Sequence, residues 1–351
     1  MIRLEAREAT PLWLNLSLPL LAIAATLVLC SGLILLAGTS IIEAWSAMFA
    51  AAFGDSYAIT ETLVKATPLV FTGLAVALAF RAKFWNIGAE GQLLAGAVAS
   101  CAVGTIPMPG PLAMVAMAVA GVLAGGALAL VPAILRVRLK VDDVVSSLLL
   151  NSIAFYALMA LIEGPWKDPL SGFPISPPIE DAANFPVLLE GTRLHIFVPV
   201  AGIVALAVWF LIARTTLGFA IRFTGENAEA ARYGGIRVER VLLSTALLSG
   251  GLAGLAGVAE VGGVHYQVMQ DISPGFGYSG IVIAMLARLN PLGVVPAAIF
   301  FAAVMTGAQA MSRATGVPVF LADVIQGLSL IAMLVALLFS AYRIRLGGRA
   351  T

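Results

Sequence analysis

Residues 84–92 read Phe-Trp-Asn-Ile-Gly-Ala-Glu-Gly-Gln, which places two amides and one carboxylate at the start of a long apolar stretch. A carboxylate at the centre of a membrane-spanning helix costs roughly 2.5 to 3.5 kcal/mol on insertion scales. Glu90 must therefore have a structural partner or a function. Asn86 and Glu90 are four residues apart, so we expect them to share one helix face near a helix N-terminus, where the dipole favours negative charge.

Two interpretations of this polar group stay open. In the first, Asn86, Glu90 and Gln92 line a path through the membrane. In the second, Asn86 caps the helix and Glu90 pairs with Arg81 or Lys83. The same choice, between an interhelical hydrogen bond and the path, applies to three single polar residues in other apolar stretches: Asn151, Glu260 and Gln309.

The composition identifies a polytopic membrane protein, which we expect to be an all-α helix bundle. Hydrophobic residues make up 60% of the 351 positions and charged residues only 11%, and the mean hydropathy is +1.00. Soluble domains have about 25% charged residues. Roughly 20 apolar residues cross the hydrocarbon, and ten stretches are predicted as spans: Leu12–Leu36, Thr62–Phe80, Asn86–Gly104, Pro111–Leu135, Val144–Ile162, His195–Ala213, Val241–Val261, Ile272–Ala287, Leu292–Met311 and Leu321–Ala341.

The eighth stretch is the weakest span, because Pro274, Gly275 and Gly277 interrupt its start. The positive-inside rule decides between a crossing and a re-entrant loop. With ten crossings and both termini in the cytoplasm, 16 of the 20 basic residues lie inside. The four left outside are Lys65, Lys167, Arg193 and Arg313. A re-entrant eighth segment would move Arg288 and the basic C-terminal tail outside, so ten spans are preferred.

The whole chain, residues 1–351, is expected to form a single transmembrane domain with two long loops. Residues 163–193 are rich in proline and predict an irregular extracytoplasmic cap. Residues 214–240 are the most charged part of the molecule and predict a cytoplasmic loop. Ser40–Tyr57 carries Trp45 and two acidic residues and is expected at the outer interface.

A short helix is predicted within the inner loop. Residues 225–236 read Gly-Glu-Asn-Ala-Glu-Ala-Ala-Arg-Tyr-Gly-Gly-Ile. Asn227 can cap a helix of about seven residues that has Glu229 in its first turn, and Gly234 and Gly235 can end it. So short a helix persists only if the flanking spans or another protein hold it.

Small residues and one repeated pattern also recur along the chain. The pairs Gly121/Gly125 and Gly250/Gly254 allow close approach of helices, either for fixed packing or for a sliding surface. Thr72-Gly73 and Ser279-Gly280 are each followed, eight residues after the glycine, by an arginine and then by another span. Transporters are often built from repeats, although such a match also arises by chance in glycine-rich helices.

Three features together resemble the permease subunits of ABC importers of the branched-chain amino acid and simple-sugar class. They are residues 84–92, the inner loop, and the glycine-rich run that contains Gly250, Gly251, Gly254 and Gly257. Within that class the chain looks most like the longer of two paired permeases in nucleoside importers that use a basic-membrane-protein type binding lipoprotein. The likeness runs from about Thr62 to Arg345. Trp85 stands where the family normally has phenylalanine, which leaves the substrate open.

The resemblance implies that residues 225–236 are similar to the coupling helix that docks on a cytoplasmic ATPase. The positions carried over are Gly225, Asn227, Ala230, Arg232, Tyr233 and Gly234. Alanines allow close approach, Tyr233 supplies a rigid anchor and Arg232 offers a fork of donors. The implied partners are a cytoplasmic ABC ATPase that binds ATP and Mg, a second related permease in a heterodimer, an extracytoplasmic substrate-binding lipoprotein and membrane lipid, but no nucleic acid. The implied location is the bacterial plasma membrane.

The motifs that are absent narrow the function. No Gly-x-x-x-x-Gly-Lys-Ser/Thr occurs, so the chain is not expected to hydrolyse ATP or to be an enzyme. With only His195 and His265, a histidine-rich metal site is excluded. The expected function is import of a small polar solute, most simply a nucleoside, with a sugar or vitamin as alternatives. The rivals are a secondary transporter coupled to ions through Glu90 or Glu260, and an intramembrane enzyme, for which the spans supply no convergent catalytic set.

Overall fold

The computed structural model describes residues 2–6, 12–36, 38–168, 172–321, 323–325, 327–328, 331–332, 335 and 342–346. The chain divides into two compact units. The larger unit covers residues 55–302, and the smaller one combines residues 1–54 with residues 303–351.

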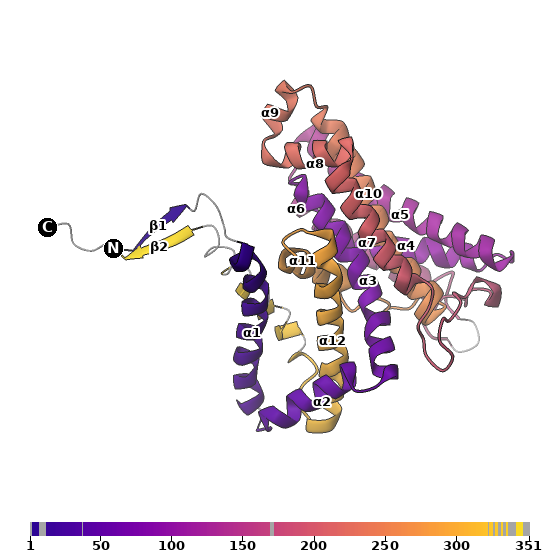
Figure 1. Cartoon of the computed structure of the whole chain (residues 1–351). Coiled ribbons are helices and arrows are strands. Elements are labelled where there is room, and N and C mark those ends of the chain that lie inside the picture. The colour runs from indigo at the N-terminus through magenta and orange to yellow at the C-terminus, as the bar shows by residue number, and fades with distance from the viewer. Residues whose placement is uncertain are drawn as a thin grey trace. The chain divides into compact units, whose positions relative to one another are not determined.

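The larger unit is a bundle of helices joined by short turns and one long loop (Figure 1). Its elements are α3 (Ser56–Arg81), α4 (Ala89–Gly104), α5 (Gly110–Leu139), α6 (Asp143–Glu163), the 3-10 turn η1 (Asp181–Ala183), α7 (Phe197–Arg214), α8 (Thr216–Glu226), α9 (Ala228–Tyr233), α10 (Val238–Glu260), the π-turn η2 (Val261–His265), α11 (Phe276–Leu286) and the first part of α12 (Pro291–Thr315). The helices α8 and α9 lie at one end of this bundle (Figure 1).

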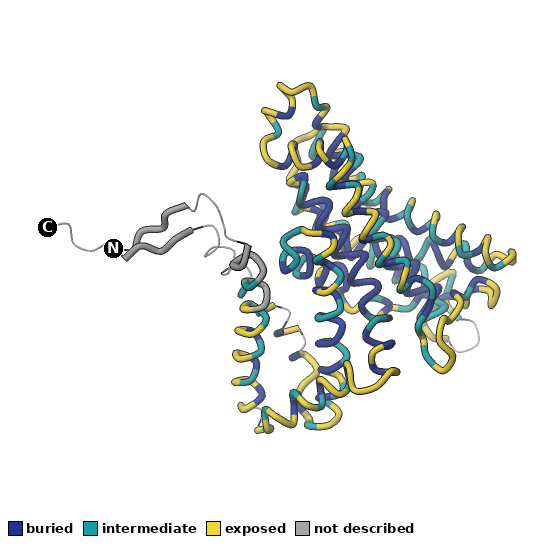
Figure 2. Tube along the Cα trace, in the orientation of Figure 1, coloured by how far each residue is buried: buried dark blue, intermediate teal, exposed yellow. Residues whose placement is uncertain are grey.

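The core of the larger unit is formed by α3, α4 and α10. Nearly every residue of α3 beyond Glu61 is buried, whereas α5, α6 and α7 each keep a broad exposed face (Figure 2). The buried helix α3 is therefore surrounded by other helices, whereas the exposed apolar faces of α5, α6 and α7 are suited to contact lipid.

Glycines set the closest helix contacts. A Cβ on Gly250 of α10 would lie 2.3 Å from the Gly125 carbonyl oxygen of α5, and one on Gly254 would lie 2.1 Å from that of Gly121. Gly96 of α4 approaches the Gly254 backbone in the same way. The two predicted glycine pairs therefore pack against each other, as small residues do between membrane helices.

The two segments of the predicted sequence repeat also meet. The Thr72 hydroxyl lies 3.0 Å from the Phe276 carbonyl oxygen, and a Cβ on Gly280 would contact Thr72. A Cβ on Gly73 would contact Ile283. The repeated pattern thus marks the place where α11 packs on α3.

The described residues of the smaller unit form α1 (Leu12–Leu36), α2 (Ile41–Phe53), the C-terminal part of α12 and a pair of strands, β1 (Ile2–Ala6) and β2 (Tyr342–Leu346). Trp45 of α2 donates its Nε1 hydrogen to the Ser31 hydroxyl of α1 at 2.9 Å. Gly307 of α12 packs on Met48 of α2.

Two short strands accompany the helices of the predicted all-α fold. β1 pairs with β2 in an antiparallel register that places Ile2 opposite Leu346 and Glu5 opposite Arg343. Both segments alternate apolar and charged residues, which is the pattern of a strand rather than a helix. The helical fold is confirmed for the remainder of the described elements.

Six of the described helices are long and apolar enough to cross a membrane: α3, α5, α6, α7, α10 with η2, and α12. The predicted span at α4 has 16 helical residues and that at α11 only 11, which correspond to about 24 and 16 Å. The break at Pro274 and Gly275 therefore shortens α11 below the thickness of the hydrocarbon.

The total number of spans stays a prediction, because it depends on the two ends of the chain. Helix α1 has the predicted bounds, and its part Ile23–Leu36 forms with α2 a pair bent by 120°. Such a pair is either a broken span or a re-entrant loop. The predicted span Leu321–Ala341 falls largely outside the described residues.

The predicted irregular loop is confirmed. Between Gly164 and Ile196 the described residues form turns, two isolated bridges and η1. Ser176 and Phe185 donate their backbone N–H groups to the carbonyls of Val268 and Gly262 at 2.9 and 2.8 Å. This loop therefore packs on the end of α10 that is remote from α9.

Candidate functional site

One face of α6 holds the segment 84–92 in place. Asp143, Ser147 and Asn151 follow each other at intervals of four residues, so they form a polar stripe along the helix. All three accept hydrogen bonds from backbone N–H groups of the segment: Trp85 to Asp143 at 2.6 Å, Ile87 to Ser147 at 3.1 Å and Gly91 to Asn151 at 2.8 Å. The stripe thus fixes an irregular backbone that would otherwise leave buried donors unpaired.

The N-terminal end of this polar stripe carries an ion pair. Asp143 pairs with Arg136 of α5, and the same guanidinium donates to the Lys83 carbonyl oxygen at 2.7 Å. The bend between α3 and α4 is therefore tied to both α5 and α6. Sequence reasoning found Asn151 but missed Asp143 and Ser147, although their spacing of four on an apolar helix is visible in the sequence.

Asn86 and Gln92 form a closed pair of buried amides. Each amide donates to the other, at 2.9 and 2.8 Å, and the Asn86 Nδ2 atom also donates to the Ser249 hydroxyl at 3.0 Å. Ser249 in turn donates to the Ala75 carbonyl oxygen at 2.7 Å. The network joins α3, α4 and α10, and its polar atoms are satisfied, so these two residues shape the site without facing a cavity.

Glu90 caps the N-terminus of α11. Its Oε2 atom accepts a hydrogen bond of 2.6 Å from the N–H group of Gly277. The side chain of Ser273 and the backbone of Gly275 lie close to this carboxylate. Because the first N–H groups of a helix have no partner within it, a carboxylate there is favourable.

This contact corrects two expectations about Glu90. Helix α4 begins at Ala89, so Asn86 precedes the helix and does not share a helix face with Glu90. Neither expected partner is an ion pair of Glu90 among the described residues: Arg81 donates to the Leu289 carbonyl oxygen, and Lys83 lies near that of Glu226. The partner is instead a helix end that is 187 positions away in sequence.

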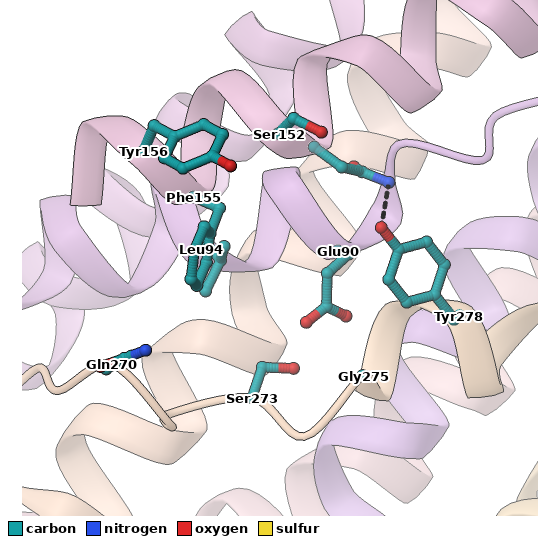
Figure 3. Close-up of a pocket in the computed structure, with 10 residues that line it drawn as sticks. Glu90, Leu94, Ser152, Phe155, Tyr156, Gln270, Ser273, Gly275 and Tyr278 are labelled. Carbon is teal, nitrogen blue, oxygen red and sulfur yellow. Dashed lines mark hydrogen bonds between the residues drawn. The ribbon is translucent and has the colours of Figure 1, made fainter. Parts of the chain in front are cut away.

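Glu90 also borders a cavity of about 300 Å³ between α4, α6 and α11. Asn151 lies on its wall and donates to the Tyr278 hydroxyl at 3.2 Å, and the Glu90 carboxylate points toward Ser273 (Figure 3). The wall combines acceptors, amides and aromatic rings: Glu90, Leu94, Asn151, Ser152, Phe155, Tyr156, Gln270, Ser273, Gly275 and Tyr278. A pocket with apolar walls and a few converging polar groups is typical of a site for a small ligand.

Close backbone packing shapes this cavity. A Cβ on Gly277 would lie 2.2 Å from the Glu90 nitrogen, and one on Gly91 would lie 3.0 Å from the Asn151 Cα atom. Two glycines therefore let α11 and α6 approach the N-terminus of α4. The carboxylate can meet the end of α11 only because of this approach.

Glu260 belongs to a different cluster. It ends α10 and pairs with His265 at 3.3 Å across the π-turn η2. Nearby, Arg193 of the long loop pairs with Glu61 of α3, and this carboxylate raises the pKa of the Arg193 guanidinium. None of these residues lines the cavity of Glu90. Gln309 is exposed on the part of α12 that belongs to the smaller unit.

The short helix predicted in the inner loop is present as α9. Asn227 caps it by accepting hydrogen bonds from the N–H groups of Glu229 and Ala230 at 3.0 and 3.1 Å. The helix ends before Gly234, and Gly235 takes a φ of +82°. It has six residues and lies between α8 and α10 in the chain. Ala231 is the buried residue of this helix.

The predicted docking residues fall into two groups. Tyr233 is 96% exposed, and Asn227, Ala230, Arg232 and Gly234 are exposed beside it. Arg232 pairs with the exposed Glu239 at 3.0 Å. Gly225 is buried instead, because a Cβ there would lie 1.9 Å from the Arg81 carbonyl oxygen. Gly225 therefore seats the loop on α3, while α9 offers an exposed surface.

These features define a multi-pass helical membrane protein with a polar cavity inside the bundle and an exposed helix at one end. The chain belongs to the family described as "Branched-chain amino acid transport system / permease component", which matches residues 58–334. It is therefore a permease, and the family resemblance seen in its sequence is confirmed.

Three relatives illustrate this family. The glucose ABC transporter permease protein TsgB13 of Haloferax volcanii is 34% identical over 98% of this chain and 93% of its own length. The guanosine ABC transporter permease protein NupP of Bacillus subtilis is 34% identical over 94% of this chain and 95% of its own. The guanosine ABC transporter permease protein NupQ of the same organism is 27% identical over 70% and 80%.

Proposed function

We propose that this chain is one transmembrane subunit of an ATP-binding-cassette importer that moves a nucleoside into the cytoplasm. The observation that carries the proposal is the likeness to the guanosine permease NupP over nearly the whole length of both chains. The family match disfavours an ion-coupled secondary transporter and an intramembrane enzyme.

The cavity beside Glu90 supports a small polar solute as cargo. Its carboxylate and amide groups accept hydrogen bonds from N–H and O–H donors, which nucleobases and sugars both carry. Phe155, Tyr156 and Tyr278 offer flat apolar surfaces against which a base can stack. A sugar is the second candidate, because the glucose permease TsgB13 is equally similar to this chain.

Two path residues follow from this geometry. Glu90 and Asn151 line the cavity, so they are the residues we propose to touch the solute. Asn86 and Gln92 act by holding the segment 84–92 in shape. Glu260 is proposed at the outer entrance, within the cluster that the long loop covers.

The proposed partners supply what this chain lacks. A cytoplasmic ABC ATPase binds ATP and Mg, and a binding lipoprotein delivers the solute from outside. A second, related permease completes the pore as a heterodimer, since Bacillus subtilis has two different guanosine permeases, NupP and NupQ. ATP binding then stabilises one of two conformations over the other.

The proposed contact with the ATPase is α9. Its six residues are too few for an isolated helix, yet it is capped at Asn227 and seated by Gly225, so it can transmit a displacement to α3 and α10. Tyr233 is almost fully exposed, so its ring is free to insert into a pocket of the partner. In this arrangement residues 214–240 face the cytoplasm and residues 163–193 face outward.

The proposed topology has ten spans with both termini in the cytoplasm of a bacterial cell. The six long helices provide most of the crossings. Helices α4 and α11 are short and meet at Glu90, and broken helices whose ends line a cavity are typical of transporters.

Uptake by the reconstituted complex tests the function. The permease is placed in vesicles with its ATPase, its second permease and its binding protein, and uptake of labelled guanosine, inosine, ribose and glucose is followed with ATP or with an ion gradient. We expect ATP-dependent uptake of the nucleosides. Uptake of ribose or glucose but of no nucleoside contradicts the substrate, and uptake that needs an ion gradient and ignores ATP contradicts the importer.

A further inference from the structure

Four cationic side chains converge on a second hollow of the larger unit. This hollow has a volume of about 350 Å³ and lies where the end of α3 meets α8 and the turn after α11. Arg81, Lys83, Arg222 and Arg288 line it, and Glu226 is the one carboxylate among the described lining residues. The four cations come from three separate parts of the chain.

The walls of this hollow are fixed by backbone contacts. Arg81 donates its Nε hydrogen to the Leu289 carbonyl oxygen at 2.9 Å, which joins the end of α3 to the turn after α11. Gly225 is seated on the Arg81 backbone, so α8 closes the third side. Arg81 and Arg288 are therefore half-buried where these elements meet, whereas Lys83 and Arg222 are exposed.

Two of the cations occupy backbone positions that favour glycine. Lys83 follows α3 and Arg288 follows α11, and each has a φ of +52°. The residue after a helix in this left-handed conformation is usually glycine, because a Cβ is strained there. A long cationic side chain stands at both positions, and both line this hollow.

The positive-inside rule accounts for basic residues at this end of the bundle but not for their convergence on one hollow. Like charges repel, and three arginine or lysine side chains in excess over carboxylate favour an anion between them. A phosphate group fits best, because its oxygens accept the paired donors of arginine. Basic pockets between helix ends at a membrane surface bind lipid phosphates in this way.

We propose that the hollow formed by Arg81, Lys83, Arg222 and Arg288 binds a phosphate group, from the head group of an anionic phospholipid or from free phosphate. The bound phosphate joins α8 to the ends of α3 and α11. Because α8 leads into α9, the bound ligand also stabilises the position of α9, the proposed contact with the ATPase. This consequence rests on the proposed function, whereas the binding of phosphate does not depend on it.

Retention of lipid by the purified full-length chain tests the proposal. The protein is placed in nanodiscs of phosphatidylcholine with a small fraction of phosphatidylglycerol, and the lipid that stays bound after transfer to detergent is measured by native mass spectrometry. Each cation near a membrane surface contributes about 1 kcal/mol, which is roughly fivefold in affinity. We expect the double variant Arg222→Gln/Arg288→Gln to bind phosphatidylglycerol about 30-fold more weakly.

A matched double variant distinguishes the loss of this binding site from a general loss of positive charge. Arg138→Gln/Arg240→Gln removes two exposed arginines that do not line the hollow, and we expect it to retain phosphatidylglycerol like the wild type. Competition by millimolar inorganic phosphate identifies free phosphate as the ligand, and the absence of competition identifies the lipid. Equal retention by both double variants, or no binding of either anion by the wild type, overturns the proposal.

A third variant guards against loss of folding. Lys83→Gly removes one cation and relieves the strained backbone, so we expect its thermal midpoint to stay the same or rise while anion binding falls about fivefold. Unchanged anion binding in a folded Lys83→Gly protein contradicts the proposal. None of these measurements uses transport, so their failure is distinct from failure of the proposed importer function.

Discussion

Removal of the Glu90 carboxylate tests the link between α4 and α11. This carboxylate accepts a hydrogen bond of 2.6 Å from the N–H group of Gly277 at the start of α11. A hydrogen bond to a charged group contributes about 1.5 to 3 kcal/mol, so its loss should cost roughly 2 kcal/mol. Glu90→Ala should lower the free energy of unfolding by about this amount. Glu90→Gln keeps one acceptor oxygen and should lower it by about 1 kcal/mol.

The assay is unfolding in mixed micelles, with the loss of helicity followed by circular dichroism. The matched control is Glu163→Gln, which changes an exposed carboxylate at the end of α6 and should stay within about 0.5 kcal/mol of the wild type. A buried carboxylate also has a desolvation cost, which opposes the hydrogen bond. If Glu90→Gln were as stable as the wild type or more so, the carboxylate would not hold α11, and the reasoning would be refuted.

Uptake by the same variants separates a cap from a path residue. If Glu90 also binds the solute, uptake by Glu90→Gln should fall by more than its loss of folded protein explains, because a buried hydrogen bond to a charged group contributes about 1.5 to 3 kcal/mol. Uptake that matches the amount of folded protein would leave Glu90 a structural cap alone.

Two further predictions concern stability. Gly250→Ala should lower the free energy of unfolding by about 1 to 3 kcal/mol, because the added Cβ would lie 2.3 Å from the Gly125 carbonyl oxygen. The control Gly202→Ala has open space around it and should be neutral or stabilising, and equal effects of the two changes in chemical unfolding would argue against the close α5–α10 contact. Asp143→Asn should cost about 2 kcal/mol, since it breaks a largely buried ion pair with Arg136 and weakens the bond from Trp85, and wild-type stability in the same assay would exclude Asp143 as an anchor of the segment 84–92.

Local signals in the sequence predicted local structure well. Asn227, Glu229 and the glycines that follow α9 determine a helix within a dozen residues, and α9 was found where they place it. The bounds of α1 and the irregular loop after α6 were predicted for the same reason. In each case the deciding interactions lie within a few positions along the chain.

Contacts between distant segments were not predictable in the same way. Composition marks Glu90 as a costly residue, but its partner is the N-terminus of α11, and no spacing rule links the two. Asp143 and Ser147 carry a visible signal, a polar stripe on an apolar helix, but what the stripe holds is known only from the fold. The strands β1 and β2 also show their alternation in the sequence, although their pairing joins the two ends of the chain.

Coupling between ATP hydrolysis and uptake tests the central claim most directly. The double variant Arg232→Ala/Tyr233→Ala removes two exposed side chains of α9, so the chain should fold and insert normally. In vesicles that contain the whole complex, ATP hydrolysis and labelled guanosine uptake are measured together. The account predicts that uptake is lost and that ATP hydrolysis no longer responds to the loaded binding protein, whereas normal uptake by the folded double variant would contradict it.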